Sequence, residues 1–349
     1  MSMDTKFSVS VVMATFNGGR FISEQLDSIA RQTHLPAELI VSDDTSTDDT
    51  IEIVKGFAKT APFPVKIIEN ETRLGYGGNF LSATKQATGA YLSFCDQDDI
   101  WLPNKLEVSL RTIEAFDADL YVHGATIVDA TGAAAGRFTQ GVRTRSVLGP
   151  LTLPPWGVFY GFSMVFRRDV FNLFDADDRG GHTFEWHGSL SHDLWIYFLA
   201  SSLGRIVVDP QPLVLYRRHD KNETPDLKAH LVHKISKYLG VAAHKNLRRD
   251  AVAAHRSKIL MDLAASDSPS RLRDQARAAS SYWNAIAQFE ADRIDIYTRD
   301  RPLSRLSRCL KLLRHGGYRA YRRGGLSWRL FVKDLMFGVL RMGRRVANN

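Results

Sequence analysis

The chain of 349 residues is long enough for one large domain with extensions. Hydrophobic residues make up 44% and charged residues 24%, and these ordinary globular values exclude a disordered or fibrous chain. Two cysteines exclude a disulfide framework and a cysteine-rich zinc module, and they favour a reducing compartment. The net charge of +8 is unevenly placed: residues 301–349 hold 11 Arg, 2 Lys and one Asp, a net of +12, so the first 300 residues carry −4.

The first hundred residues alternate between two hydrophobic patterns. β-branched apolar runs predict strands at 7–13, 38–41, 65–68 and 90–95. Helical spacing of apolar residues predicts helices at 20–32, 47–59 and 78–87. Strand and helix alternating at these lengths predict an α/β fold, Rossmann-like, with a mostly parallel sheet flanked by helices on both faces.

The rest of the chain changes character twice. Residues 119–216 are strand-rich and irregular with one helix near 193–202, and residues from 226 onward are helical in pattern. We therefore expect a catalytic domain over 1–225 and a helical C-terminal region over 226–349, with the boundary near Thr224–Pro225.

No membrane-crossing segment is expected from the sequence. The longest uncharged segment, Ser146–Phe166, contains three prolines and three glycines, so it predicts a loop followed by a strand. The N-terminus lacks the pattern of a secretory signal, which favours a cytoplasmic location.

Polar residues follow three of the four predicted strands. Asn17 follows the first strand, Asp43 and Asp44 the second, and Asp96–Asp99 the fourth. Because ligands of parallel α/β sheets bind outside the carboxyl ends of the strands, these residues are candidates for a binding site.

The acidic segment Asp96–Asp99 places three carboxylates within four residues. Such repulsion is relieved by a cation, and oxygen ligands suit Mg²⁺ or Mn²⁺ shared with a diphosphate. The alternative is a solvated turn before the helix that starts near Pro103. A P-loop is absent, because Gly75–Asn79 lacks both its spacing and its Lys-Ser/Thr pair.

Four ordered blocks resemble those of the family 2 glycosyltransferases, which have the GT-A fold. The subgroup that they resemble is rhamnosyltransferase-like. The blocks are VVMATFN (Val11–Asn17), IVSDDTSTD (Ile40–Asp48), NETRLGY (Asn70–Tyr76) and DQDDIWLP (Asp96–Pro103). The resemblance continues through His192–Trp195 and Pro212–Asn222, and it fades in the helical region.

The resemblance implies roles for individual residues of this chain. The nucleotide-sugar site would be lined by Thr15, Asn17, Asp43, Asp44, Arg73, Asn79 and Asp96, with Thr15 and Asp43 at the base and ribose. Asp96 and Asp98 would form an Asp-x-Asp motif that binds the metal, with Asp98 the direct ligand. Asp193 would be the catalytic base, although an N-cap of the following helix is the alternative.

Five further positions near the site carry an open question or a departure from the family. Arg217 and Arg218 could clamp the diphosphate and His219 could add a metal ligand; a basic loop is the alternative. Ala14 stands where a proline is usual, and His192 stands where many relatives have Glu, so a second carboxylate is missing there.

These observations predict an inverting, metal-dependent glycosyltransferase. The donor would be a UDP-, dTDP- or GDP-linked sugar, and the acceptor a saccharide, such as a lipid-linked or surface polysaccharide precursor. The acceptor motif of processive synthases is absent after Tyr216, which favours transfer of a single sugar. A nucleotidylyltransferase would need a Gly-rich phosphate loop that the N-terminus lacks, and a non-catalytic binding or scaffold protein would leave the acidic strand ends unexplained. No nucleic-acid partner is expected.

Residues 328–340 predict a basic amphipathic helix. Its expected apolar face consists of Trp328, Phe331, Val332, Leu335, Met336 and Val339, and its basic face of Arg329, Lys333, Arg341 and Arg344. Such a helix is typical of an element that lies on a membrane surface, here the cytoplasmic face. Packing against the body of the protein is the alternative.

Overall fold

The computed structural model describes residues 7–183, 188–220, 222 and 248–342, and the chain divides into two compact units. The sheet unit comprises Met1–Pro150, Gly157–Ala176 and Ser191–Lys221, and the helical unit comprises Leu151–Trp156, Asp177–Leu190 and Asn222–Asn349. The predicted boundary near Thr224–Pro225 lies outside the described residues. Two early segments belong to the helical unit, which sequence patterns do not anticipate.

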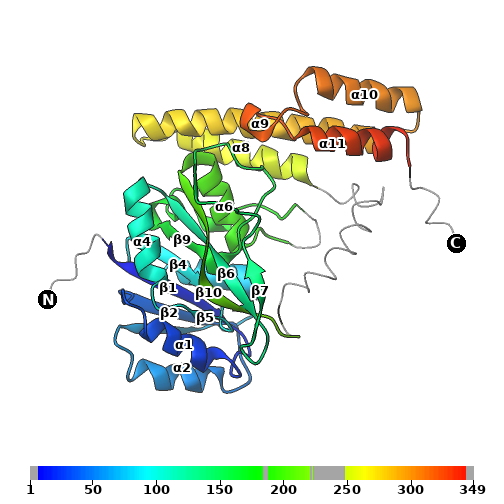
Figure 1. The fold of residues 1–349 in the computed structure, drawn as a ribbon. Helices are drawn as coiled ribbons and strands as arrows, with labels where there is room; N and C mark the ends of the chain where they lie inside the picture. Colours follow the sequence, from blue (N-terminus) through cyan, green and yellow to red (C-terminus); the bar gives the residue numbers. More distant parts are fainter. Residues whose placement is uncertain (1–6, 184–187, 221, 223–247, 343–349) are drawn as a thin grey trace. The chain divides into compact units, whose positions relative to one another are not determined.

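The sheet unit begins with the predicted alternation of strands and helices (Figure 1). The strands are β1 (Val9–Thr15), β2 (Glu38–Asp43), β3 (Val65–Glu69) and β4 (Tyr91–Cys95), and the helices are α1 (Ile22–Ala30), α2 (Thr50–Ala58) and α3 (Gly75–Thr84). All three strand pairs in the order β3-β2-β1-β4 are parallel. The carboxyl ends of β1, β2 and β4 therefore meet at one edge of the sheet, as the sequence predicts.

The second half of the sheet is mixed. Its elements are β5 (Ile100–Trp101), α4 (Lys105–Phe116), β6 (Leu120–Val128), β7 (Ala134–Phe138), β8 (Ser146–Leu148), β9 (Met164–Arg167), α5 (Arg168–Phe171), α6 (His192–Leu203) and β10 (Ile206–Arg217). β9 lies antiparallel between β4 and β6, and β10 runs parallel to β6 and antiparallel to the short β5. Because β5 directly follows the acidic segment, this pairing brings the end of β10 to the same edge of the sheet.

The central strands bury both faces, which explains their continuous apolar runs. Val9, Val11 and Met13 of β1 share one core cluster with apolar residues of α1, α2 and α4. On the other face, Phe94 of β4 contacts Phe80 of α3, with ring centroids 5.3 Å apart. The α/β fold with helices on both faces is confirmed.

The described residues of the helical unit after residue 247 include three long helices, one short helix and a C-terminal π-helical turn. These are α8 (Arg249–Ala265), α9 (Ser270–Thr298), α10 (Pro302–Arg314), α11 (Trp328–Lys333) and a π-helical turn at Asp334–Val339. A core cluster of this unit joins α9, α10 and the π-helical turn through Ile296, Tyr297, Cys309, Leu312, Tyr318 and Val339. The helical pattern expected in this part of the chain is thus present in its described residues.

The predicted amphipathic helix at 328–340 differs from expectation in two ways. It is divided between α11 and the π-helical turn, and its apolar face is split. Phe331, Leu335 and Val339 pack in the core cluster of the helical unit, whereas Trp328 and Val332 are exposed. The physical reason is the buried carboxylate of Asp334, which turns this segment toward α9 through bonds to Arg293 and Tyr297. Arg344 lies outside the described residues.

No helix in the described parts of the chain combines the length and apolar character that crossing a bilayer requires.

Candidate active site

A buried hydrogen-bond network joins the ends of β1 and β2. Thr15 and Asp43 are register partners, and the Thr15 hydroxyl donates to Asp43 Oδ1 at 2.7 Å. Ser46 donates to the same carboxylate from its backbone N–H at 2.7 Å and from its hydroxyl at 2.5 Å. Asp43 is 2% exposed, so three donors hold a buried carboxylate in one orientation. Sequence reasoning missed Ser46, although Asp side chains commonly accept from backbone and hydroxyl groups a few residues further along the chain.

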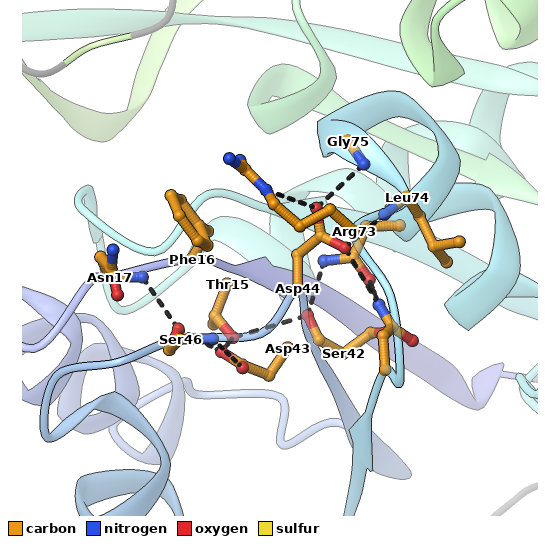
Figure 2. Close-up of polar contacts among 12 residues, drawn as sticks. Thr15, Phe16, Asn17, Ser42, Asp43, Asp44, Ser46, Arg73, Leu74 and Gly75 are labelled. Carbon is orange, nitrogen blue, oxygen red and sulfur yellow. Dashed lines mark hydrogen bonds and ion pairs between the residues drawn. The ribbon is translucent and has the colours of Figure 1, made fainter.

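The neighbouring carboxylate of Asp44 holds the start of α3. It accepts the backbone N–H groups of Leu74 at 2.6 Å and Gly75 at 2.9 Å, and Arg73 Nε lies 3.8 Å from it (Figure 2). A negative group at a helix N-terminus satisfies unpaired N–H groups and complements the helix dipole. This contact explains why α3 begins at Gly75 and not near Gly78 as predicted: the capping residue comes from another strand.

Arg73 extends from this loop across an aromatic ring. Its guanidinium lies 3.8 Å from the ring centroid of Phe16, which follows β1, and its side chain is 57% exposed (Figure 2). The remaining exposed surface of both groups is available to a planar or anionic ligand. Phe16 was not singled out from the sequence, because a single aromatic residue after a strand has no distinctive pattern.

The side chains of Asn17 and Asn79 form hydrogen bonds to neighbouring loops of the protein. Asn17 adopts a left-handed backbone with φ of 49°, and its side-chain oxygen accepts the backbone N–H of Thr47 at 2.8 Å. Asn79 is 1% exposed, and its amide donates to the Ser42 carbonyl at 2.8 Å while it accepts from Asn70 at 2.9 Å. Both asparagines therefore shape the loops around Asp43 and Asp44.

Gln97, inside the acidic segment, bridges to the end of β1. Its side chain accepts the Phe16 N–H at 2.9 Å and donates to the Phe16 carbonyl at 3.0 Å. An added Cβ at Gly18 would lie 2.2 Å from the Gln97 amide oxygen, so a larger residue there would displace the Gln97 side chain from Phe16. Sequence reasoning missed Gln97, although it stands between two carboxylates that were singled out.

The end of β10 supports the acidic segment. Arg217 is 2% exposed; its guanidinium donates to the Asp98 carbonyl at 3.0 Å, the Ala130 carbonyl at 3.2 Å and Glu24 at 2.7 Å. These contacts indicate that Arg217 positions the backbone at Asp98. Arg218 lies half-buried and donates to the Tyr216 hydroxyl at 2.8 Å.

The structure brings His219 and Asp98 together, as the proposed metal site requires. His219 Nε2 lies 2.8 Å from Asp98 Oδ2, and the imidazole packs on Phe21 with ring centroids 4.8 Å apart. A carboxylate oxygen and an imidazole nitrogen at this separation are two ligands that a divalent cation could share. Among the described residues, no group of three or more His, Cys, Asp or Glu side chains has the geometry of a metal site.

The carboxylates of the acidic segment repel one another. Removal from solvent, then the charges of Asp98 and Asp193, raise the pKa of Asp96 to about 7. Burial, then the charges of Asp98 and Asp96, raise the pKa of Asp99 well above its usual value, and its Oδ2 has no hydrogen-bond partner among the described residues. A positive charge would relieve this excess.

A buried lysine lies beside this segment and was missed from the sequence. Lys105 is fully buried, donates to the Phe162 carbonyl at 2.9 Å and lies 3.4 Å from the ring centroid of Trp101. Desolvation lowers its pKa to about 7, so at neutral pH the amine is about half protonated and offsets only part of the acidic charge.

Asp193 lies in the first turn of α6. Its Oδ1 accepts from the Ser191 hydroxyl at 2.5 Å and from the Leu194 N–H at 2.8 Å. Its charge contributes to the raised pKa values of Asp96 and of Tyr160, which places all three within electrostatic reach. The N-cap of α6 is Ser191, so Asp193 is an acidic residue of the first turn.

Residues 10–174 match the family model described as Glycosyl transferase family 2. Over 252 residues the chain is 27% identical to the dTDP-rhamnosyl transferase RfbG of Shigella flexneri, covering 68% of this chain and 81% of that protein. Over 104 residues it is 36% identical to the UDP-Glc:alpha-D-GlcNAc-diphosphoundecaprenol beta-1,3-glucosyltransferase WfgD of Escherichia coli, covering 30% of this chain and 40% of that protein. Two further curated relatives, both uncharacterized, are matched over 66% and 59% of their length.

One solved structure resembles both units in fold. S. aureus TarS 1-349 in complex with UDP-GlcNAc aligns with a TM-score of 0.51 at 18% identity, covering 93% of this chain and 92% of that chain. The likeness supports the predicted GT-A fold with its C-terminal helical region.

Proposed function

We propose that this chain, whose residues 10–174 match the model described as Glycosyl transferase family 2, transfers one sugar from a nucleoside-diphosphate donor to a saccharide hydroxyl with inversion. One observation carries the proposal: His192, which precedes Asp193 on α6, packs on Phe94 of β4, two residues before Asp96, with ring centroids 4.8 Å apart. A candidate base and the acidic segment thus share one site at the carboxyl edge of the sheet. Transfer of a glycosyl group requires both, one for the acceptor proton and one for the departing diphosphate.

The nucleoside would bind at the ends of β1 and β2. Asp43, held by Thr15 and Ser46, is oriented to accept from a base or ribose, and the Phe16 ring with the Arg73 guanidinium offers a stacking surface. The donor class of the proposal is a UDP-, dTDP- or GDP-linked hexose or deoxyhexose. The matches to RfbG and WfgD and the UDP-GlcNAc bound by TarS support this class.

The protein would perform three tasks in the reaction. The Asp193 carboxylate takes the proton of the acceptor hydroxyl as that oxygen attacks the anomeric carbon and the diphosphate departs. Arg217 fixes the Asp98 backbone, so that the acidic segment keeps its place beside the diphosphate. The position before Asp193 holds His192 and not a second carboxylate, which supports a single displacement with inversion.

A divalent cation is the cofactor that this site fits. Asp98 and His219 would hold Mg²⁺ or Mn²⁺, with Asp96 beside them, and diphosphate oxygens would complete the shell. When bound, the cation supplies positive charge that stabilises the departing diphosphate. The raised pKa values of Asp96 and Asp99 are the observation that supports this fit, since both report uncompensated negative charge.

The acceptor of the proposal is a lipid-linked or surface polysaccharide precursor at the cytoplasmic face of a membrane. The diphosphoundecaprenol-linked acceptor in the name of WfgD supports the lipid-linked class. The net charge of +12 in residues 301–349 supports a location beside anionic lipid.

The test begins with thermal stabilisation of the whole chain by UDP, dTDP and GDP in the presence of Mn²⁺, which identifies the donor nucleotide. Transfer of a labelled sugar from that donor to polyprenyl-diphosphate-linked saccharides is then measured for wild type and Asp193→Asn. Asparagine still accepts the Leu194 N–H, so the fold of α6 is kept. We expect a loss of about 10²–10⁴-fold in transfer with nearly unchanged nucleotide binding.

The matched control is Asp169→Asn, an exposed carboxylate in the first turn of α5. It should retain full activity. Normal turnover by Asp193→Asn would remove the assignment of the base. Nucleotide binding without transfer by the wild type to any acceptor offered would instead favour a nucleotide-sugar-binding or scaffold protein.

A further inference from the structure

Helix α10 presents a row of leucines to solvent. Leu303, Leu306, Leu310 and Leu313 recur at helical spacing on one face and are 81%, 36%, 42% and 45% exposed. Most helices of a globular unit turn such a face inward, because its burial stabilises the fold. We call these four residues the leucine face.

A neighbouring side of α10 is fixed in the helical unit. Arg305 is 4% exposed, and its guanidinium donates to the carbonyls of Val339 at 2.9 Å and Asp300 at 2.6 Å. Cys309 and Leu312 lie in the core cluster on the same side. The helix cannot rotate to bury the leucine face without exposing these groups, so the face is a stable outer surface of the described unit.

The surroundings of the leucine face are cationic. Arg301, Lys311 and Arg314 are exposed on α10 or next to it. Lys311 contacts Asp292 of α9 at 3.2 Å, and Arg308 contacts Asp295 at 3.2 Å, so part of this charge is paired. From residue 301 to the end the sequence has one side-chain carboxylate, Asp334, which is fully buried against Arg293. Among the described residues after Arg301, no exposed side-chain carboxylate opposes this positive charge, and the exposed Asp300 lies directly before the segment.

The leucine face, with its neighbouring cations, is complementary to an anionic bilayer. Leucines enter the boundary between headgroups and acyl chains, while Lys and Arg remain among the phosphates. A second copy of the chain fits this face less well, because two surfaces of the same positive charge would meet. Exposed Trp328 and Leu340, at 66% and 62%, add apolar surface to the same unit.

We propose that the leucine face of α10 docks the protein on the surface of an anionic phospholipid membrane. This docking surface is distinct from the segment 328–340 that the sequence favoured, half of whose apolar face is packed. Docking would bring the active site to a lipid-linked acceptor, and only this role of the docking rests on the proposed function.

The experiment is co-sedimentation of the whole chain with vesicles of phosphatidylcholine alone or with about 30% phosphatidylglycerol. Wild type should bind the anionic vesicles and release at high salt. The double variant Leu310→Ser, Leu313→Ser should bind at least about tenfold more weakly, since two apolar side chains no longer enter the lipid. Its thermal unfolding and its stabilisation by nucleotide should match wild type, because both leucines are exposed.

The control is Met261→Ser, which removes an apolar side chain that is 48% exposed on α8. It should bind vesicles like wild type. Equal binding by wild type and the double variant would overturn the proposal, as would loss of binding by Trp328→Ser but not by the double variant. Self-association abolished by the double variant, without vesicle binding by wild type, would assign the face to a second copy. Nucleotide binding and transfer are measured separately, so their failure is distinguishable from failure of docking.

Discussion

One buried guanidinium connects three distant parts of the sheet unit. Arg217 at the end of β10 contacts Glu24 of α1, the carbonyl of Ala130 and the carbonyl of Asp98, and its backbone N–H donates to Asp99. A planar group with five fixed donors is suited to such a junction, and lysine could not make the same set of bonds. Arg217 therefore holds the acidic segment in position through hydrogen bonds to Asp98 and Asp99. Arg73, in contrast, is exposed, so a ligand can reach its guanidinium.

His192 makes stability depend on pH. The ring is 5% exposed, stacks on Phe80 at 4.1 Å between centroids, and neither ring nitrogen has a hydrogen-bond partner among the described residues. Desolvation lowers its pKa to about 4, although the charge of Asp193 opposes the shift. The folded-state value is below the unfolded value of about 6.5, so this stabilisation is complete above pH 6.5 and is lost as the pH falls toward 4.

We expect His192→Leu to weaken this dependence. Between pH 7 and pH 4.5 the free energy of unfolding of the wild type should fall by up to about 3 kcal/mol more than that of the variant. Denaturant unfolding at a series of pH values measures the difference. His315→Gln, which changes an exposed ring after α10, should keep the wild-type slope. Parallel slopes for wild type and His192→Leu would contradict the assignment.

At the scale of elements, β2 and α3 are joined by the Asp44 carboxylate. Asp44→Ala leaves the N–H groups of Leu74 and Gly75 without their acceptor at a half-buried junction. We expect a loss of about 1–3 kcal/mol in the free energy of unfolding and weaker nucleotide binding, because Arg73 loses its ion pair. Chemical denaturation and the thermal shift with UDP and Mn²⁺ measure the two effects.

Asp27→Ala is the control for this change. It removes an exposed carboxylate of α1 that contacts Arg31 at 3.9 Å, and such a pair contributes little. A stability of Asp44→Ala equal to that of Asp27→Ala would show that α3 does not depend on this contact.

The same junction shows what sequence patterns can predict. Strand runs and helical spacing gave the order of β1 to β4 with the helices between them, because these signals depend on residues close in the chain. Helix α3 begins three residues earlier than predicted, because the carboxylate that accepts its first backbone N–H groups belongs to Asp44, directly after β2. Gln97 and Lys105 were missed for the same reason: their importance comes from contacts with Phe16 and Phe162, which only the fold brings near.

At the scale of the whole molecule, the division into two units agrees with the division of charge but not with a single cut in sequence. Leu151–Trp156 and Asp177–Leu190 belong to the helical unit, although both lie within the stretch that sequence assigned to the catalytic domain. Trp156 shows the reason, since its indole N–H donates to Glu290 of α9 at 2.7 Å. A loop that packs against a helix more than 100 residues away has no sequence pattern of its own that predicts this contact.

A buried ion network holds the helical unit, and its loss should affect that unit alone. Asp334 is fully buried and accepts from Arg293 at 2.8 and 3.0 Å and from the hydroxyls of Tyr297 and Tyr318 at 2.9 and 3.0 Å. Asp334→Ala leaves the buried Arg293 with Glu290 as its remaining carboxylate, at 2.6 Å. Removing one partner of a buried pair costs about 3–5 kcal/mol, because the other charge stays desolvated.

Calorimetry of the whole chain tests whether the units unfold separately. We expect Asp334→Ala to lower one transition, and nucleotide with Mn²⁺ to raise the other by the same amount in variant and wild type, because the ligand binds only the folded sheet unit. Asp300→Ala, which changes an exposed carboxylate before α10, should move neither transition. A single transition that shifts with both perturbations would mean that the two units unfold as one cooperative body, and the network would then stabilise the active site as well as the helices.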